Sequence, residues 1–133
     1  MSTSIRFGYS ADEVSYAICS ASESVGELVY TNLTKTGDLY NVSKVDITSY
    51  SKMPAIGVII SKQSTTRCRV KWSGPIRGIY SGLTPGRMYF VGSDSKPTLA
   101  FPTVAGTRLQ KIGSATSTNE LYLKPSTEVF VRS

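Results

Sequence analysis

The sequence predicts an all-β protein, and three observations support this fold class. From residue 26 onward, short segments rich in β-branched and aromatic residues follow one another, each bounded by Gly, Pro, Asn or Ser. A helix is hard to place anywhere, apart from one short candidate near the N-terminus. Two of the segments have the spacing of an antiparallel hairpin. We therefore expect the 133 residues to form one compact antiparallel β-barrel, β-tulip-like fold or β-sandwich.

Residues 1–25 are expected to form an extended N-terminal arm, followed by a β-barrel-like domain over residues 26–133. The arm is rich in Ser and Ala, and nothing in its composition demands a packed interior. Its first ten residues alternate so that three apolar side chains would share one edge. These side chains are Ile5, Phe7 and Tyr9. The same alternation would also suit an ordinary first strand of the barrel, and a short helix over 12–19, capped by Ser10, is a further alternative.

The expected strands of the domain follow at short intervals, separated by turn residues. They are 28–31, 40–47, 56–61, 66–72, 76–80, 88–91, 107–112, 121–123 and 129–131. The segment 40–47 roughly alternates apolar and polar residues, which is typical of a strand with one face in water. Pro85 and Gly86 predict a turn between two strands, because Pro fixes φ and Gly accepts a positive φ.

Segments 56–61 and 66–72 are expected to pair as a hairpin, since the four residues between them suit a hairpin loop. Side-chain alternation gives the second strand a core face and a wet face. The expected core face carries Cys68, Val70 and Trp72. The opposite face carries a basic stripe of Arg67, Arg69 and Lys71. Such a stripe is either a solvated strand face or a contact with an acidic partner surface.

Two pieces of the sequence recur at a spacing of about 60 residues. The segment 26–30, a Gly followed by apolar residues, resembles the segment 86–90. The segment 56–61, an Ile-Gly pair followed by Ser, resembles the segment 112–117. Two such halves could close into a pseudo-symmetric barrel without open sheet edges. Chance similarity between short β segments is the alternative explanation.

The composition leaves little room for a metal site or a catalytic site. Cys19 and Cys68 lie far apart in the sequence and are expected to be reduced apolar residues. Two Cys without any His are too few for a structural zinc, and the nine acidic residues form no calcium loop. Without His, the usual base for a Ser or Cys nucleophile is missing. We therefore expect no cofactor, no metal and no enzymatic activity.

No apolar run approaches the roughly 20 residues that a membrane-spanning helix needs, so no membrane association is expected. The N-terminus also lacks the apolar stretch of a signal peptide. The formal charge of +6 is spread singly along the chain. A nucleic-acid partner is therefore not the first expectation, because such proteins gather their cations along one track.

Four pieces of the sequence, in a fixed order, resemble a β-rich domain of structural proteins in tailed bacteriophages. The pieces are 54–57 (PAIG), 74–78 (GPIRG), 81–90 (SGLTPGRMYF) and 110–115 (QKIGSA). The resemblance covers roughly residues 26–124. Domains of this kind occur in head decoration or cement proteins and also in tail-fibre proteins, so the resemblance implies a part of the virion, assembled in the bacterial cytoplasm.

Decoration proteins of this class are typically small single domains and often trimers, which fits a chain of 133 residues. We therefore expect a non-enzymatic capsid decoration protein, a homotrimer that stabilises the head shell by bridging subunits of the major capsid protein or other virion subunits. The expected contact residues are Ile5, Phe7, Tyr9, Arg67, Arg69 and Lys71. One alternative is a tail-fibre or appendage module that binds a host receptor or glycan through exposed tyrosines. A further alternative is a barrel that binds single-stranded nucleic acid.

Overall fold

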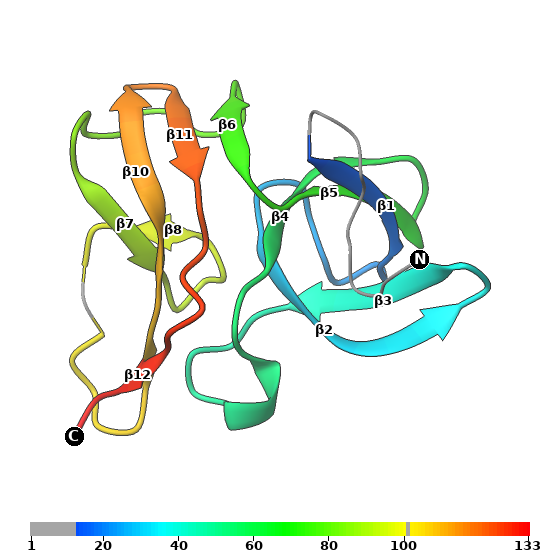
Figure 1. Cartoon of the computed structure of the whole chain (residues 1–133), viewed down its shortest axis with the longest axis horizontal. Coiled ribbons are helices and arrows are strands. Elements are labelled where there is room, and N and C mark those ends of the chain that lie inside the picture. Colours follow the sequence, from blue (N-terminus) through cyan, green and yellow to red (C-terminus); the bar gives the residue numbers. More distant parts are fainter. Residues whose placement is uncertain (1–12, 101) are drawn as a thin grey trace.

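The structure is a computed structural model and describes residues 13–100 and 102–133. Strands dominate the described residues, which contain no α-helix and one 3-10 turn, η1 (Tyr50–Lys52), so the predicted all-β class is confirmed. The strands are β1 (Val14–Ile18), β2 (Leu28–Thr36), β3 (Leu39–Lys44), β4 (Gly57–Lys62), β5 (Arg67–Lys71), β6 (Gly74–Arg77), β7 (Met88–Val91), β8 (Pro97–Thr98), β9 (Arg108–Leu109), β10 (Lys111–Ser117), β11 (Glu120–Leu123) and β12 (Phe130–Val131). They form a barrel, an open sheet and a two-stranded ribbon of β9 and β12 (Figure 1).

The barrel, on the right of Figure 1, closes in the order β1-β3-β2-β4-β5. It is mixed rather than purely antiparallel as expected, because β1 runs parallel to β3 where Ile18 lies opposite Asn41. The predicted hairpin of β4 and β5 is confirmed, with Ile59 opposite Val70. Small and β-branched side chains fill the interior, which suits a narrow barrel. They are Ala17, Cys19, Val29, Val42, Ile59, Cys68 and Val70.

The second sheet has the order β6-β11-β10-β7-β8 and stays open. Its inner face packs against barrel strands β2 and β4. The shared core contains Leu28 and Val58 from the barrel and Ile76, Val91, Ile112, Leu121 and Leu123 from the sheet. Pro75 and Pro97 lie on its two edge strands. Because Pro has no N–H to offer a further strand, both edges are poor templates for extending the sheet.

Most predicted strands differ in their bounds from those of the structure, and two of the differences have a clear local reason. The segment expected at 76–80 is a strand only over Gly74–Arg77, since Gly78 follows with a φ of +77° and ends it. The segment expected at 107–112 is split into β9 and β10 at Gln110, whose side chain bonds to the backbone of other segments.

The structure contradicts the expected N-terminal arm over part of its length. Residues Val14–Ile18 are strand β1, which pairs with β5 along its whole length and closes the barrel. The arm over residues 1–25 is therefore wrong for this segment, and so is the alternative of a helix over 12–19. Ala17 is fully buried while Tyr16 is exposed, as barrel strands require. The expected contact residues Ile5, Phe7 and Tyr9 lie outside the described residues.

The barrel and the open sheet repeat one plan. In each, an N-terminal strand (β1 or β6) is followed by a hairpin (β2-β3 or β7-β8) and then by a second hairpin (β4-β5 or β10-β11). The last strand of the second hairpin pairs with the N-terminal strand in both halves. Only the first half closes into a barrel, because β8 is two residues long and does not reach β6 as β3 reaches β1.

The strand registers confirm the recurrence that the sequence predicts. Val29 lies opposite Gly57 between β2 and β4, and Tyr89 lies opposite Gly113 between β7 and β10. The turns before these strands also correspond in their hydrogen bonds. In the first half the amide of Gly26 donates to the carbonyl of Ile59 at 2.8 Å.

In the second half the amide of Gly86 donates to the carbonyl of Ala115, also at 2.8 Å. The predicted turn at Pro85 and Gly86 is confirmed, with a φ of +83° at Gly86 and a hydrogen bond from the amide of Arg87 to the carbonyl of Thr84. The two halves therefore correspond in the register of their central strands and in the turns before them.

Candidate functional site

The predicted basic stripe lies on the outside of barrel strand β5. Cys68 and Val70 are fully buried, so the side chains between them point outward as expected. Arg67 is exposed, while Arg69 and Lys71 are half-buried. The structure therefore brings the three cations together on one face of the strand.

Two aromatic residues border this stripe in different ways. The guanidinium carbon of Arg67 lies 4.7 Å from the centre of the exposed Tyr16 ring on β1, which is a cation–π contact. Trp72, expected in the core, is only half-buried because β5 ends at Lys71. Part of the stripe is thus already engaged within the barrel, because Arg67 lies against Tyr16.

A second surface, which the sequence did not suggest, lies on the outside of the open sheet. Ser114 on β10 lies opposite Met88 on β7 and opposite Tyr122 on β11, so the three side chains form one cross-strand row. The Met88 side chain is 41% exposed and that of Tyr122 is 49% exposed. We call the surface centred on Met88, Ser114 and Tyr122 the outer face.

The repeated plan shows what is unusual about the outer face. The positions of Met88 and Ser114 correspond to those of Leu28 and Val58 in the first half. Leu28 and Val58 are fully buried, in the core that the barrel shares with the open sheet. The same surface is therefore covered in the first half and uncovered in the second.

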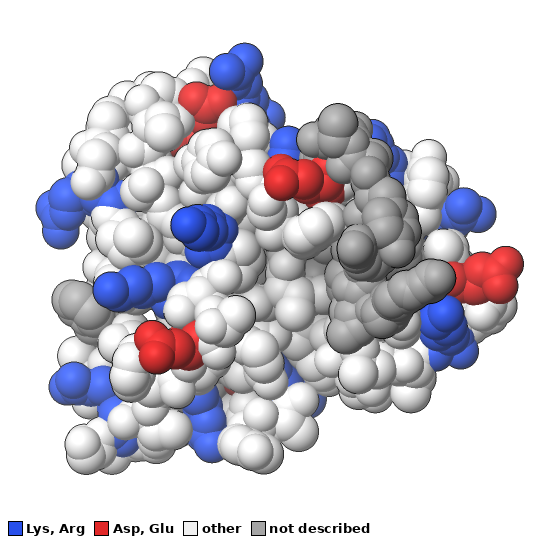
Figure 2. All heavy atoms as spheres, viewed as in Figure 1, with Lys and Arg blue, Asp and Glu red and all other residues white. Residues whose placement is uncertain are grey.

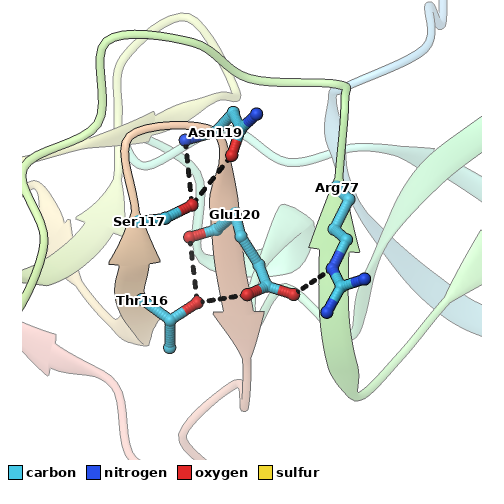
Figure 3. Close-up of polar contacts among 5 residues, drawn as sticks. All are labelled: Arg77, Thr116, Ser117, Asn119 and Glu120. Atoms are coloured by element: carbon cyan, nitrogen blue, oxygen red, sulfur yellow. Dashed lines mark hydrogen bonds and ion pairs between the residues drawn. The ribbon is translucent and has the colours of Figure 1, made fainter.

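One end of the outer face carries an ion pair. Arg77 on β6 binds the carboxylate of Glu120 on β11, and the hydroxyl of Thr116 donates to the same carboxylate at 2.7 Å (Figure 3). These contacts, first the hydrogen bond from Arg77, lower the pKa of the Glu120 carboxyl group. Glu120 therefore stays charged and its charge is matched by Arg77.

The other end of the outer face is hollowed and positively charged. A depression of about 460 Å³ lies beside β10 and is lined by Met88, Lys111, Gly113, Ser114, Tyr122, Lys124, Pro125, Ser126 and Thr127. Lys111 and Lys124 are both exposed, and no lining residue is acidic. Figure 2 shows basic side chains on the side of the molecule where the open sheet lies.

A separate hollow of about 360 Å³ lies near η1 and β12. It is lined by Tyr50, Ser51, Met53, Pro54, Arg108, Val129 and Val131. The ring of Tyr50 is 83% exposed, and the guanidinium carbon of Arg108 lies 5.8 Å from its centre. An exposed aromatic ring beside a cation is a surface on which a sugar ring can stack.

The titratable side chains do not assemble into a reactive group in the part of the chain that the structure describes. Cys19 and Cys68 are free and buried, and burial raises the pKa of the Cys68 thiol to about 12. Within residues 13–100 and 102–133, no three His, Cys, Asp or Glu side chains are grouped as metal ligands. The same residues include no helix with the length and apolar character needed to cross a membrane.

Sequence reasoning missed the outer face because its signal resembles that of a core strand. Tyr122 lies between Leu121 and Leu123, which are both fully buried, so the three together suggest an apolar run. Alternation of Glu120 and Tyr122 on one side of β11 was the available clue. Comparisons of the chain with family models, curated proteins and solved structures found no match.

Proposed function

We propose that this chain is a non-enzymatic structural subunit of a bacteriophage particle that decorates the head shell by binding assembled capsid subunits. The observation that carries this proposal is the outer face of the open sheet. It has an exposed aromatic and a methionine at its centre and charged groups at both ends. Such a surface, apolar in the middle and polar at the rim, suits docking on another protein.

The rigidity of the platform supports the same role. The outer face is formed by three paired strands whose inner side chains are buried in the shared core, so its geometry is set before a partner arrives. The sequence resemblance to phage structural domains gives the class of partner. In this proposal a subunit that binds only assembled capsid protein stabilises the shell by mass action. Trimer formation at a capsid symmetry axis is part of the proposal.

Binding to purified shells tests the proposal directly. The full chain would be incubated with undecorated capsids and sedimented, and saturable co-sedimentation at a fixed ratio to capsid protein is expected. A Tyr122→Ser variant should bind less, whereas Tyr40→Ser on the β2-β3 hairpin, far from the outer face in sequence and topology, is the matched control. Capsids that never retain the intact chain would contradict a role in decoration.

A second candidate function is glycan binding by a tail-fibre or appendage module, which the hollow beside Tyr50 favours. The exposed ring and the adjacent Arg108 resemble a sugar-stacking platform with a polar neighbour. Binding of immobilised host-surface glycans by the intact chain, lost in Tyr50→Ser and retained in Tyr122→Ser, would favour this function. Shell binding that is insensitive to Tyr50→Ser would favour decoration.

A further inference from the structure

We infer that the hollow at the basic end of the outer face binds carboxylate side chains of an acidic protein segment, while Tyr122 and Met88 pack against apolar atoms of that partner. This inference rests on the proposed function, because it names the chemistry of the surface that docks there.

The charges of the hollow select an acidic occupant. Lys111 and Lys124 both line it, both are exposed, and neither forms an ion pair with any residue that the structure describes. None of the lining side chains is acidic. A partner that covers this hollow would remove water from two ammonium groups, and carboxylates are the groups that compensate for that loss.

The apolar part of the face provides the area of contact. Tyr122 and Met88 flank the small side chain of Ser114, so a partner chain can lie between an aromatic ring and a thioether. Tyrosine and methionine are enriched at the centres of protein interfaces, since both bury a large area at little cost in polar groups. In the first half, the positions that correspond to Met88 and Ser114 are Leu28 and Val58, and both are already fully buried.

Glu120 argues for a protein rather than a nucleic acid at this face. It lies two residues from Tyr122 on the same side of β11, and its low pKa keeps it ionised. A phosphate backbone that crossed the face would leave the two lysines for the Arg77–Glu120 pair, which carries no net charge, whereas nucleic-acid grooves are positive along the whole track. A protein partner can place its acidic residues at the lysine end alone.

A second copy of this chain is a poorer occupant for the same reason. The acidic side chain at the outer face is that of Glu120, and its charge is already neutralised by Arg77. Two copies that met through their outer faces would therefore leave Lys111 and Lys124 without carboxylates.

The test uses a peptide that alternates Glu and Ala as the probe, and a peptide that alternates Gln and Ala as its uncharged control. The full chain, labelled with ¹⁵N, is titrated with each peptide. We expect the acidic peptide to shift the amide signals of Ser114 and Tyr122, and the uncharged peptide to shift neither. The double variant Lys111→Glu, Lys124→Glu should lower the affinity by about tenfold or more, because each lysine becomes repulsive.

The double variant Lys44→Glu, Lys96→Glu is the matched control, since it changes the net charge by the same amount and both lysines are exposed and outside the hollow. Its affinity should stay within about twofold of the unchanged chain, as distant surface charges are largely screened. An equal loss in both variants would mean that net charge alone attracts the peptide and would overturn the inference. Tighter binding of an oligothymidine strand through the same two lysines would overturn it in favour of nucleic acid.

Shell binding separates this inference from the proposed function. If the intact chain decorates capsids and the Lys111→Glu, Lys124→Glu variant does so equally well, the assignment of the hollow fails and decoration stands. If the intact chain does not bind capsids but the peptide titration gives the expected result, decoration fails and the acidic-segment site stands. Self-association of the chain that disappears in the double variant would assign the face to a second copy instead and would overturn the inference.

Discussion

Gly57 and Gly113 hold the same position in the two halves of the molecule, and at neither is there room for a side chain. A Cβ atom on Gly57 would lie 2.7 Å from the carbonyl oxygen of Lys71, and one on Gly113 would collide with the carbonyl oxygen of Tyr122. Lys71 and Tyr122 are themselves equivalent, since each lies opposite the residue that follows the glycine. Both halves therefore require glycine at this position of the second hairpin, where the backbone of the partner strand comes close.

Replacing either glycine by alanine should destabilise the fold. We expect Gly57→Ala and Gly113→Ala each to lower the free energy of unfolding by about 2 kcal/mol or more, because backbone atoms must move to admit the methyl group. The loss should be larger at Gly113, whose φ of +143° is also unfavourable for alanine. Urea denaturation would measure both changes.

Gly37→Ala is the control for positive φ alone, since Gly37 has a φ of +65° and no atom within 4 Å of a Cβ. A loss of stability in Gly37→Ala as large as that in Gly57→Ala would contradict the steric explanation.

Gln110 should be one of the most sensitive polar residues, because its buried amide holds two distant segments together. Its side chain accepts a hydrogen bond from the amide of Ala55 and donates to the carbonyls of Ala55 and Ser126. Gln110→Met would leave these buried backbone groups without partners and should cost about 3 kcal/mol. Gln63→Met, at an exposed glutamine, should change stability by less than about 0.5 kcal/mol. Similar values for the two variants in urea denaturation would remove the structural role of Gln110.

Both thiols should react with iodoacetamide more slowly than exposed cysteines do. Cys68 is fully buried in the barrel, and Cys19 is nearly so, with its thiol 3.6 Å from the carbonyl oxygen of Thr65. We expect Cys68 to react only when the barrel opens and Cys19 to react somewhat faster, since it retains slight exposure. Mass spectrometry of the native protein would follow each site. Rapid labelling of Cys68 under native conditions would mean that the core face of β5 is misassigned.

The raised pKa of Cys68 also predicts a loss of stability in alkali. Burial raises the pKa of this thiol from 9.0 to about 12, so the unfolded chain releases the proton at a lower pH than the folded chain does. The contribution of Cys68 to stability is therefore complete below pH 9.0 and decreases as the pH rises toward 12. The difference in unfolding free energy between the unchanged chain and Cys68→Ala should be constant at neutral pH and should shrink above pH 9.0. A difference that does not change with pH would contradict the burial of the thiol.

Sequence patterns predicted the elements that depend on residues close together in the sequence. The segment 88–91 is a strand with the expected bounds, and Gly86 has the positive φ that its turn position predicts. The hairpin of β4 and β5 followed from alternation and loop length. The recurrence of Gly57 and Gly113 was also visible in the sequence, because a position that a neighbouring backbone approaches closely is restricted to glycine in both halves.

The elements that were missed depend on contacts between distant segments. Strand β1 turns the small residues Ser15 and Ala17 into the barrel, so its interior-facing positions lack the large apolar side chains of a typical core strand, although Val14, Tyr16 and Ile18 alternate with them. Its position follows from pairing with β5, about 50 residues away, which no local pattern records. The outer face was missed for a related reason, since only the packing of the open sheet against the barrel distinguishes the covered Leu28 from the uncovered Met88. One of the three cations of the expected basic stripe was in turn less free than its sequence suggested, because Tyr16 lies against Arg67.

The place of β1 in the barrel determines how the role of the N-terminal residues must be tested. Deleting residues 1–20 would remove β1, leave β3 and β5 with open edges and expose the barrel interior, so this variant should lose its cooperative unfolding transition. Deleting residues 1–10 keeps β1 and should give a chain whose circular dichroism and urea midpoint match those of the intact protein. The shorter deletion removes Ile5, Phe7 and Tyr9, the residues expected to contact capsid subunits.

If these residues contribute to decoration, the 1–10 deletion should reduce occupancy on undecorated capsids while the fold is unchanged. Ordering each residue of a free segment costs roughly 1 to 2 kcal/mol, so such an arm gives net attachment only if its apolar side chains are well buried on the shell. A triple variant of Ile5, Phe7 and Tyr9 to Ser in the full-length chain is the matched control, because it removes the apolar edge without changing the length. Occupancy equal to that of the intact chain in both variants would exclude the N-terminal residues from the docking surface and leave the outer face of the open sheet to carry it.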